Sequence, residues 1–199
     1  MKKRVLSYLG VICMCLHILS GTVFADVINS TGNNAFSDVP ANAEYAEAVN
    51  ALHECGIING DEKGNFNPDK PITRAETAAI MCRFMGVGEE AKDKTTTPFT
   101  DVPSSHWAKG YIARVNELGI MNGYGNKEFG PDDEITYAQI ITMLVRKLGA
   151  EQQALNAGGY PSGYITVAEN LGVTKCILFQ SDALAPKSAV AHLIYNCIN

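Results

Sequence analysis

Apolar residues recur at the spacing of a helix in two segments between residues 40 and 86, with a polar segment between them. The first segment ends at Gly56, a residue type that commonly terminates helices. The apolar positions are Tyr45, Ala48, Val49 and Leu52 in the first segment, and Ala78, Ile80, Met81, Phe84 and Met85 in the second. This pattern predicts a helix, a turn-rich loop and a second helix, and each helix is expected to bury one face.

The second helix is predicted to begin at a capping box formed by Thr73 and Glu76. In this motif the threonine hydroxyl accepts a hydrogen bond from the amide three residues on, and the glutamate accepts one from the threonine amide. Arg74 lies between them, in the first turn, where the positive end of the helix dipole disfavours a cation. Its position therefore indicates a role outside the helix.

The whole pattern returns 63 residues later. The matching blocks are Phe36–Pro40 with Phe99–Pro103, Gly56–Gly60 with Gly119–Gly123, Phe66, Pro68 and Asp69 with Phe129, Pro131 and Asp132, and Ile72–Thr73 with Ile135–Thr136. One register across four separate blocks is the signature of a structural repeat. A third, degenerate copy begins near Gly158 and closes with an apolar segment after Pro186. Because one such unit is too small to bury its own apolar face, the units are expected to stack on one another.

The first 25 residues have the features of a signal peptide, namely a basic start, a mostly apolar stretch and small residues before Asp26. The apolar stretch is short and interrupted by polar residues, and no later segment has the length of a membrane span, so we expect no span after cleavage. The predicted organisation is a signal peptide over 1–25, a linker over 26–35, repeat 1 over 36–95, repeat 2 over 96–157 and degenerate repeat 3 over 158–199. The predicted fold class is all-α, with six main helices in three hairpin-like pairs and little strand.

Cleavage after Ala25 would leave 13 basic residues against 21 acidic ones, so the net charge would fall from −5 to −8. Such a charge argues against a nucleic-acid partner. Export permits disulfides between the remaining cysteines, but each lies among apolar residues, which favours buried thiols. These cysteines are Cys55, Cys82, Cys176 and Cys197.

No cofactor or metal site is expected from the sequence, because it has no CxxC motif or closely spaced Cys/His pair. Asp61, Lys63 and Asn65 superficially resemble a calcium-binding loop, but a lysine stands where an oxygen ligand is needed. Asp38 and Asp101 each precede a predicted helix and are interpreted as helix caps.

Taken together, these blocks resemble the surface-layer homology (SLH) family of bacterial cell-wall anchoring modules. The resemblance rests on the Phe-x-Asp-Val-Pro start, His106-Trp107-Ala108, the Gly-Ile-x-x-Gly block, the Phe-x-Pro-Asp turn and Ile-Thr-Arg-Ala-Glu. It implies three repeats in a pseudo-threefold helical bundle. It also implies that grooves between repeats bind a secondary cell-wall polysaccharide, often one that carries ketal-linked pyruvate. The arginine of the Thr-Arg-Ala-Glu motif, here Arg74, would line such a groove, and its planar fork suits a carboxylate.

Repeats 2 and 3 depart from this motif at the arginine. Repeat 2 has Tyr137 there and keeps the capping residues, whereas repeat 3 has Lys187 and lacks the cap. Repeat 2 also has Trp107 where repeat 1 has Glu44. The predicted ligand-binding residues are therefore Arg74 as the main contact, Lys187 as a second contact, Tyr137 as a stacking platform, and Trp107.

Each of these residues also has a purely structural interpretation. Arg74 would then pair with a neighbouring acidic residue, and Trp107 would be half-buried packing, since aromatic residues dominate small cores.

Three functions remain open from the sequence alone. The first, which is favoured, is a non-catalytic module that holds a secreted protein on the cell wall by binding polysaccharide. The second is a degenerate module without polymer binding that acts as a structural or protein-interaction unit, with a separate surface protein as its partner. The third, a wall hydrolase, is disfavoured because none of His53, His106 and His192 lies beside a candidate nucleophile in the sequence.

Overall fold

The computed structural model describes residues 34–199. They contain eight α-helices and a few isolated β-bridges, joined by turns and loops. The helices are α3 (Ala46–Glu54), α4 (Arg74–Phe84), α5 (Gly88–Lys92), α6 (Lys109–Glu117), α7 (Tyr137–Lys147), α8 (Glu151–Asn156), α9 (Ser162–Asn170) and α10 (Lys187–Asn196). The all-α prediction is confirmed. The predicted signal peptide over 1–25 and most of the predicted linker over 26–35 lie outside the described residues.

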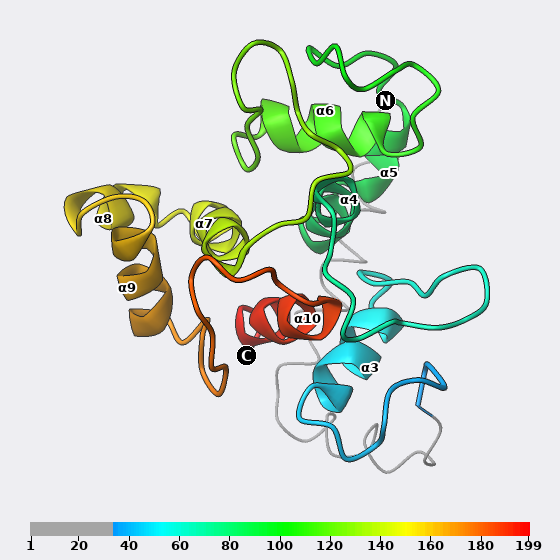
Figure 1. Ribbon diagram of the computed structural model, residues 1–199, viewed down its shortest axis with the longest axis vertical. Helices are drawn as coiled ribbons and strands as arrows, with labels where there is room; N and C mark the ends of the chain where they lie inside the picture. Colours follow the sequence, from blue (N-terminus) through cyan, green and yellow to red (C-terminus); the bar gives the residue numbers. More distant parts are fainter. Residues whose placement is uncertain (1–33) are drawn as a thin grey trace, which may run out of the picture. The chain divides into compact units, whose positions relative to one another are not determined.

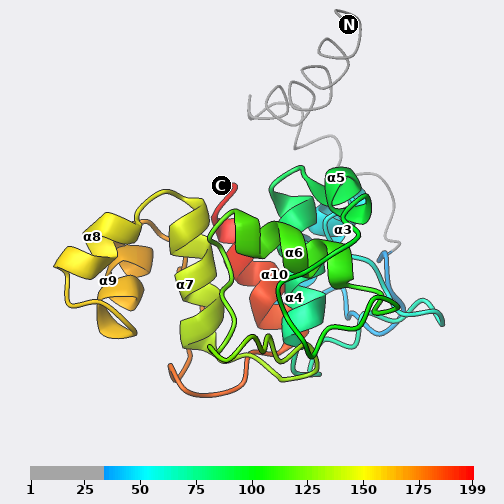
Figure 2. The same cartoon turned by 90° about the horizontal axis from the view of Figure 1, so that it is seen from above.

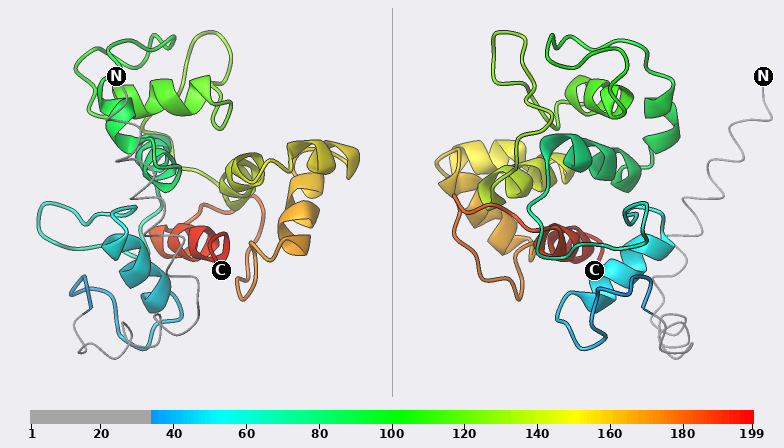
Figure 3. Two further views of the ribbon diagram at one scale, coloured as in Figure 1. Left: turned by 180° about the vertical axis from the view of Figure 1, so that it is seen from behind. Right: turned by 45° about the vertical axis from the view of Figure 1, so that its right-hand side comes forward.

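Helices α4, α7 and α10 lie at the centre, and the other helices lie around them (Figure 1). The same arrangement is seen from above in Figure 2 and from two further sides in Figure 3. Each central helix packs against the first helix of the next repeat: α4 against α6, α7 against α9, and α10 against α3. The prediction of hairpin-like pairs is therefore wrong, because the loop inside each repeat carries the chain to a neighbouring repeat. The last pairing, α10 with α3, closes the bundle.

A ring of backbone hydrogen bonds joins the three repeats just before the central helices. The amide of Ile72 donates to the carbonyl of Ala185 (3.2 Å), that of Ala185 to Ile135 (2.8 Å), and that of Ile135 to Ile72 (3.1 Å). All three residues are fully buried. Because each equivalent position makes the same bond to the next repeat, the ring confirms the pseudo-threefold arrangement.

The central helices differ in how their first turns are capped. Both hydrogen bonds of the capping box are present at Thr73 and Glu76 in α4, and at Thr136 and Gln139 in α7. Pro186, which precedes α10, provides no side-chain cap. The buried residues of α4 cover one broad face, and the partly exposed Glu76, Ile80, Arg83 and Phe84 form the opposite face. The prediction that this helix buries one face is therefore confirmed, but Ile80 and Phe84, which were assigned to the buried face, are only partly buried.

Asp38 and Asp101 do not cap helices. The Asp38 carboxylate accepts hydrogen bonds from the amides of Phe66 and Asn67 (2.9 and 2.6 Å), which are 28 and 29 residues further along the chain. Asp101 accepts equivalent bonds from Phe129 and Gly130. Each aspartate therefore holds the part of the loop that precedes the central helix of its own repeat. The interpretation of both as helix caps is wrong.

The cysteines are less buried than predicted. Cys82 is buried and Cys197 is partly buried, whereas Cys55 and Cys176 are exposed. Cys82, Cys176 and Cys197 are free thiols. Within residues 34–199, none of the helices combines the length and the apolar character needed to cross a bilayer.

Candidate functional site

Arg74 is buried in the contact between repeats 1 and 2. Its side chain is 4% exposed, its Nε donates to the carbonyl of Phe129 (2.7 Å), and its Nη2 donates to the carbonyl of Asn122 (2.8 Å). The guanidinium lies between the rings of Tyr124 and Phe129, at 4.6 and 4.5 Å from their centroids. These contacts account for an arginine in the first turn of a helix, because backbone carbonyls and aromatic faces compensate for its burial.

Burial lowers the pKa of Arg74, and the surrounding Tyr124, Asp133 and Asp101 oppose this effect. The structural alternative of an ion pair with one acidic residue does not describe the site, because both recorded donors bind carbonyl oxygens. Nη1 donates to no acceptor among residues 34–199.

A groove between α4 and α10 contains two of the four predicted ligand-binding residues. We call it the α4–α10 groove; it has a volume of about 310 Å³. Lys187 from α10 and Trp107 from the segment before α6 line it, together with Glu76 and Arg83 from α4. The loop of repeat 1, including Asp61, forms a further wall. The groove therefore brings together side chains from all three repeats.

Lys187 is held near the N-terminus of α4 by an ion pair with Glu76. Its Nζ lies 3.0 Å from Oε1 of Glu76, and the two side chains are 18% and 28% exposed. Burial favours the neutral form of Glu76, but the amide of Thr73 and the ammonium of Lys187 outweigh it and lower the pKa of this carboxyl. Glu76 therefore has two functions, since its other oxygen accepts the bond of the capping box.

Arg83 lies in the same groove and was missed by the sequence analysis. Within the described part of the chain, its guanidinium forms no hydrogen bond or ion pair. Its Cζ lies 5.5 Å from the centroid of the Tyr111 ring. A basic residue in the last turn of a helix is usually explained by the helix dipole, so its position alone did not indicate a binding role. The repeat offset of 63 aligns Arg83 with Arg146. This correspondence could have singled out Arg83 from the sequence.

Trp107 is 60% exposed, which argues against the interpretation of this residue as half-buried packing. Its indole lies beside His106 and Tyr111, with ring centroids 6.0 and 6.5 Å away. Tyr160 has the corresponding position at the start of the next repeat and is 59% exposed. The exposed indole lines the same groove as Arg83 and Lys187 and offers a flat apolar surface of the kind that sugar rings contact.

Tyr137 lines a different groove, between α7 and α10, with a volume of about 480 Å³. Its ring stacks on Phe179 (5.3 Å between centroids, 21° between planes) and is 9% exposed. Glu44 and His192 also line this groove, whose lining includes no lysine or arginine. Arg74 lines neither groove. The structure therefore groups Lys187 with Trp107 and separates Tyr137 and Arg74 from them.

Comparison with known proteins identifies the repeats. Residues 35–78 and 98–141 each match the S-layer homology domain. The chain is 35% identical over 152 residues to a cell surface protein of Thermoanaerobacter kivui, covering 75% of this chain and 19% of that protein. It is 32% identical over 142 residues to the middle cell wall protein of Brevibacillus brevis, covering 71% of this chain and 13% of that protein.

An amylopullulanase of Thermoanaerobacterium thermosulfurigenes is 37% identical over 130 residues, which are 62% of this chain and 7% of that enzyme. The chain thus spans about a fifth or less of the length of these relatives. The matching family and the surface proteins confirm the predicted location at the bacterial cell wall or surface. By its two matched repeats, the chain belongs to the S-layer homology family of cell-wall anchoring modules.

Proposed function

We propose that the chain anchors to the cell wall by binding an anionic secondary wall polysaccharide, and that the α4–α10 groove is the main binding site. The observation that carries this proposal is the grouping of Lys187, Arg83 and the exposed Trp107 in one groove. The names of relatives such as the middle cell wall protein and the surface layer protein of Brevibacillus species agree with an anchoring role.

The two cations would contact an acidic substituent, such as the carboxylate of ketal-linked pyruvate. Arg83 forms no ion pair with the described residues, although Glu76 and Asp61 line the same groove. Its planar fork matches a carboxylate in a bidentate geometry. Lys187 would contribute a point charge after partial release from Glu76. A negative net charge elsewhere on the protein does not prevent this, because charges beyond about 10 Å are largely screened at physiological salt.

Trp107 would bind the sugar ring that carries the acidic group. An aromatic face buries the apolar face of a pyranose, and a nearby cation then fixes the orientation of the sugar through its charged substituent. The predicted contact of Arg74 with the polymer stays a prediction, for which Nη1 is the remaining donor. Tyr137 likewise stays a predicted stacking residue, with one face covered by Phe179.

The proposal is tested by titrating purified wall polysaccharide into the protein and into Arg83→Ala, Lys187→Ala and Trp107→Ala variants, with calorimetry as the readout. Each of these changes is expected to weaken binding by about tenfold or more, because each removes one group from a small site. Matched controls are Lys175→Ala, which removes an exposed charge outside both grooves, and Tyr160→Ala, which removes an equally exposed aromatic ring.

Controls that bind as tightly as the unaltered protein would localise binding to the groove. If the groove variants all bound like the unaltered protein, the proposed site would be wrong. If the unaltered protein bound no polymer, the alternative of a degenerate interaction module would replace the proposal.

A further inference from the structure

A second hollow is lined by Trp107 together with several basic residues. It has a volume of about 320 Å³ and lies between the end of α5, the following linker and the start of α6. Lys92, Lys94, Lys109 and His106 line it together with Trp107, and the lining includes no aspartate or glutamate. We call it the lysine hollow. Such a surface is unusual on a chain with a net charge of −5.

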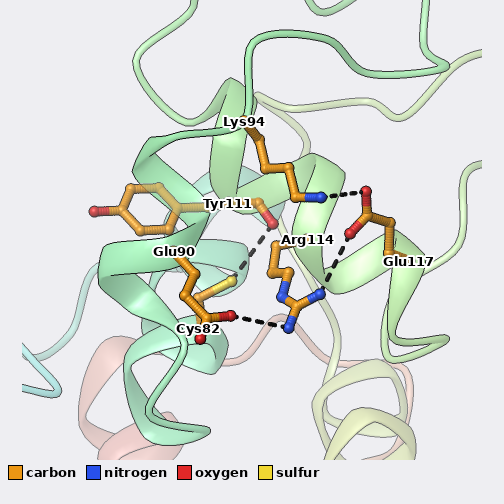
Figure 4. Close-up of polar contacts among 6 residues, drawn as sticks. All are labelled: Cys82, Glu90, Lys94, Tyr111, Arg114 and Glu117. Atoms are coloured by element: carbon orange, nitrogen blue, oxygen red, sulfur yellow. Dashed lines mark hydrogen bonds and ion pairs between the residues drawn. The ribbon is translucent and has the colours of Figure 1, made fainter. Parts of the chain in front are cut away.

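Ion pairs and close packing connect the walls of the lysine hollow, and Figure 4 shows the ion pairs of Lys94 and Arg114. Lys94 in the linker binds Glu117 of α6 (2.8 Å), and Arg114 of α6 binds Glu90 of α5 (3.1 Å). Gly110 permits close packing of α5 on α6, since a Cβ there would lie 2.0 Å from the carbonyl oxygen of Ala91. The hollow is therefore a fixed feature of the fold.

The ammonium groups remain available to an incoming anion although each has a partner. Lys92 is bound to Glu89 and Lys94 to Glu117; the first pair is largely exposed to solvent and the second is partly exposed. Lys109 donates to the carbonyl of Ser104, which is uncharged. An ammonium has three donors, so one exposed pair leaves two donors for a ligand.

The lysine hollow and the α4–α10 groove share the lining residue Trp107. Tyr111 lines the hollow, and its ring lies under Arg83 of the groove. The ion pair with Glu89 raises the pKa of Lys92, and the positive charge of Arg83 weakly opposes this effect. A chain of sugars crossing the indole from the groove would thus meet a second cluster of positive charge.

We propose that the lysine hollow binds a second anionic group of the same wall polysaccharide, one that follows along the polymer from the group bound in the α4–α10 groove. This inference rests on the proposed function. It extends the site from a single sugar with its acidic substituent to a longer segment of polymer, which would lie across Trp107. Several weak, exposed charges then add to the affinity only for a ligand long enough to reach them.

The test compares a Lys92→Gln/Lys94→Gln/Lys109→Gln variant with the unaltered protein, using wall polysaccharide of many repeats and a fragment of one repeat. The expected result is a loss of about tenfold in affinity for the long polymer and no change for the fragment. The matched control is Lys63→Gln/Lys127→Gln/Lys175→Gln, which changes net charge equally at exposed positions elsewhere and is expected to bind both ligands normally. Inorganic phosphate is titrated into both proteins to test whether the hollow binds a small anion that is not part of the polymer.

Equal affinity of the lysine-hollow variant and the unaltered protein for the long polymer would overturn this inference alone. An equal loss for the one-repeat fragment, or for inorganic phosphate without effect on the long polymer, would also overturn it, because the hollow would then not extend the groove. Failure of the unaltered protein to bind either polysaccharide would overturn the proposed function together with this inference.

Discussion

Arg74 and Lys187 have equivalent positions at the starts of α4 and α10, but their surroundings differ. Arg74 contacts the loop of repeat 2, where the rings of Tyr124 and Phe129 cover its guanidinium. Lys187 lines the α4–α10 groove beside the loop of repeat 1, where the residue corresponding to Tyr124 is Asp61. Asp61 is not aromatic, and its carboxylate accepts bonds from its own turn, so it offers Lys187 no ring of the kind that Tyr124 offers Arg74.

The same position therefore carries an arginine covered by two rings in repeat 1 and a lysine that lines a groove in repeat 3. The covered arginine holds the loop of repeat 2 by its carbonyls, and its charge contributes to stability. Lys187 remains partly exposed at a groove, where its ammonium is paired with Glu76. Substitutions that separate stability from binding therefore test the comparison directly.

The largest effect is expected for Arg74→Ala. This change leaves the carbonyls of Phe129 and Asn122 without their donors and opens the space between two rings, so the free energy of unfolding should fall by about 3 kcal/mol. Urea denaturation followed by circular dichroism measures it. Lys187→Ala is the matched control and should cost less than about 1 kcal/mol, because its ion pair is partly exposed. Equal losses for the two variants would refute the division into scaffold and ligand roles.

A smaller effect, about 1 to 2 kcal/mol at neutral pH, is expected for Asp101→Asn. Burial disfavours the ionised form of Asp101, but the amides of Gly130 and Phe129 outweigh it and lower the pKa of this carboxyl. Because the folded pKa lies below the unfolded value, this stabilisation is present above about pH 4 and is lost as the pH falls through the folded pKa. The difference between the two proteins in urea denaturation should therefore shrink below pH 4. A constant difference down to pH 2 would contradict the assignment.

Loss of a capping hydroxyl is expected to cost about 1 kcal/mol in either repeat, in Thr73→Ala or in Thr136→Ala. The Thr73→Ser variant keeps the hydroxyl and should be nearly as stable as the unaltered protein. Thermal unfolding of the three variants measures this. A loss at Thr73 without a loss at Thr136 would show that the two boxes contribute differently, and that repeats 1 and 2 are less alike than their hydrogen bonds indicate.

Local features of the fold were predictable from the sequence because they depend on neighbouring residues. The helix after Thr73 and its copy after Thr136 follow from spacing and capping within a few positions. The packing of α10 on α3 was not predictable from helix periodicity, since it joins residues about 140 positions apart. Asp38 shows the same limit: its spacing fits a helix cap, but its partners lie in a turn 28 residues away.

The candidate site was predictable in part, for the same reason. The repeat register singled out the position shared by Arg74 and Lys187, but it did not show that Tyr124 covers the arginine. Arg83 could have been found by aligning it with Arg146, yet only the three-dimensional arrangement shows that it lines the same groove as Lys187. Exposure of a side chain such as Trp107 likewise depends on which helices surround it.

The smallest change in stability, with an opposite change in binding, is expected for Glu76→Gln. Repeat 2 already has a glutamine in the corresponding capping box, so the box should persist. The ion pair with Lys187 is lost, which should cost less than about 1 kcal/mol because both side chains are partly exposed. Removing a carboxylate from the α4–α10 groove frees the ammonium and reduces repulsion of an anionic polymer, so calorimetry should show affinity about threefold higher. Unchanged or weaker binding, with stability preserved, would mean that Lys187 belongs to the scaffold and does not bind the polymer.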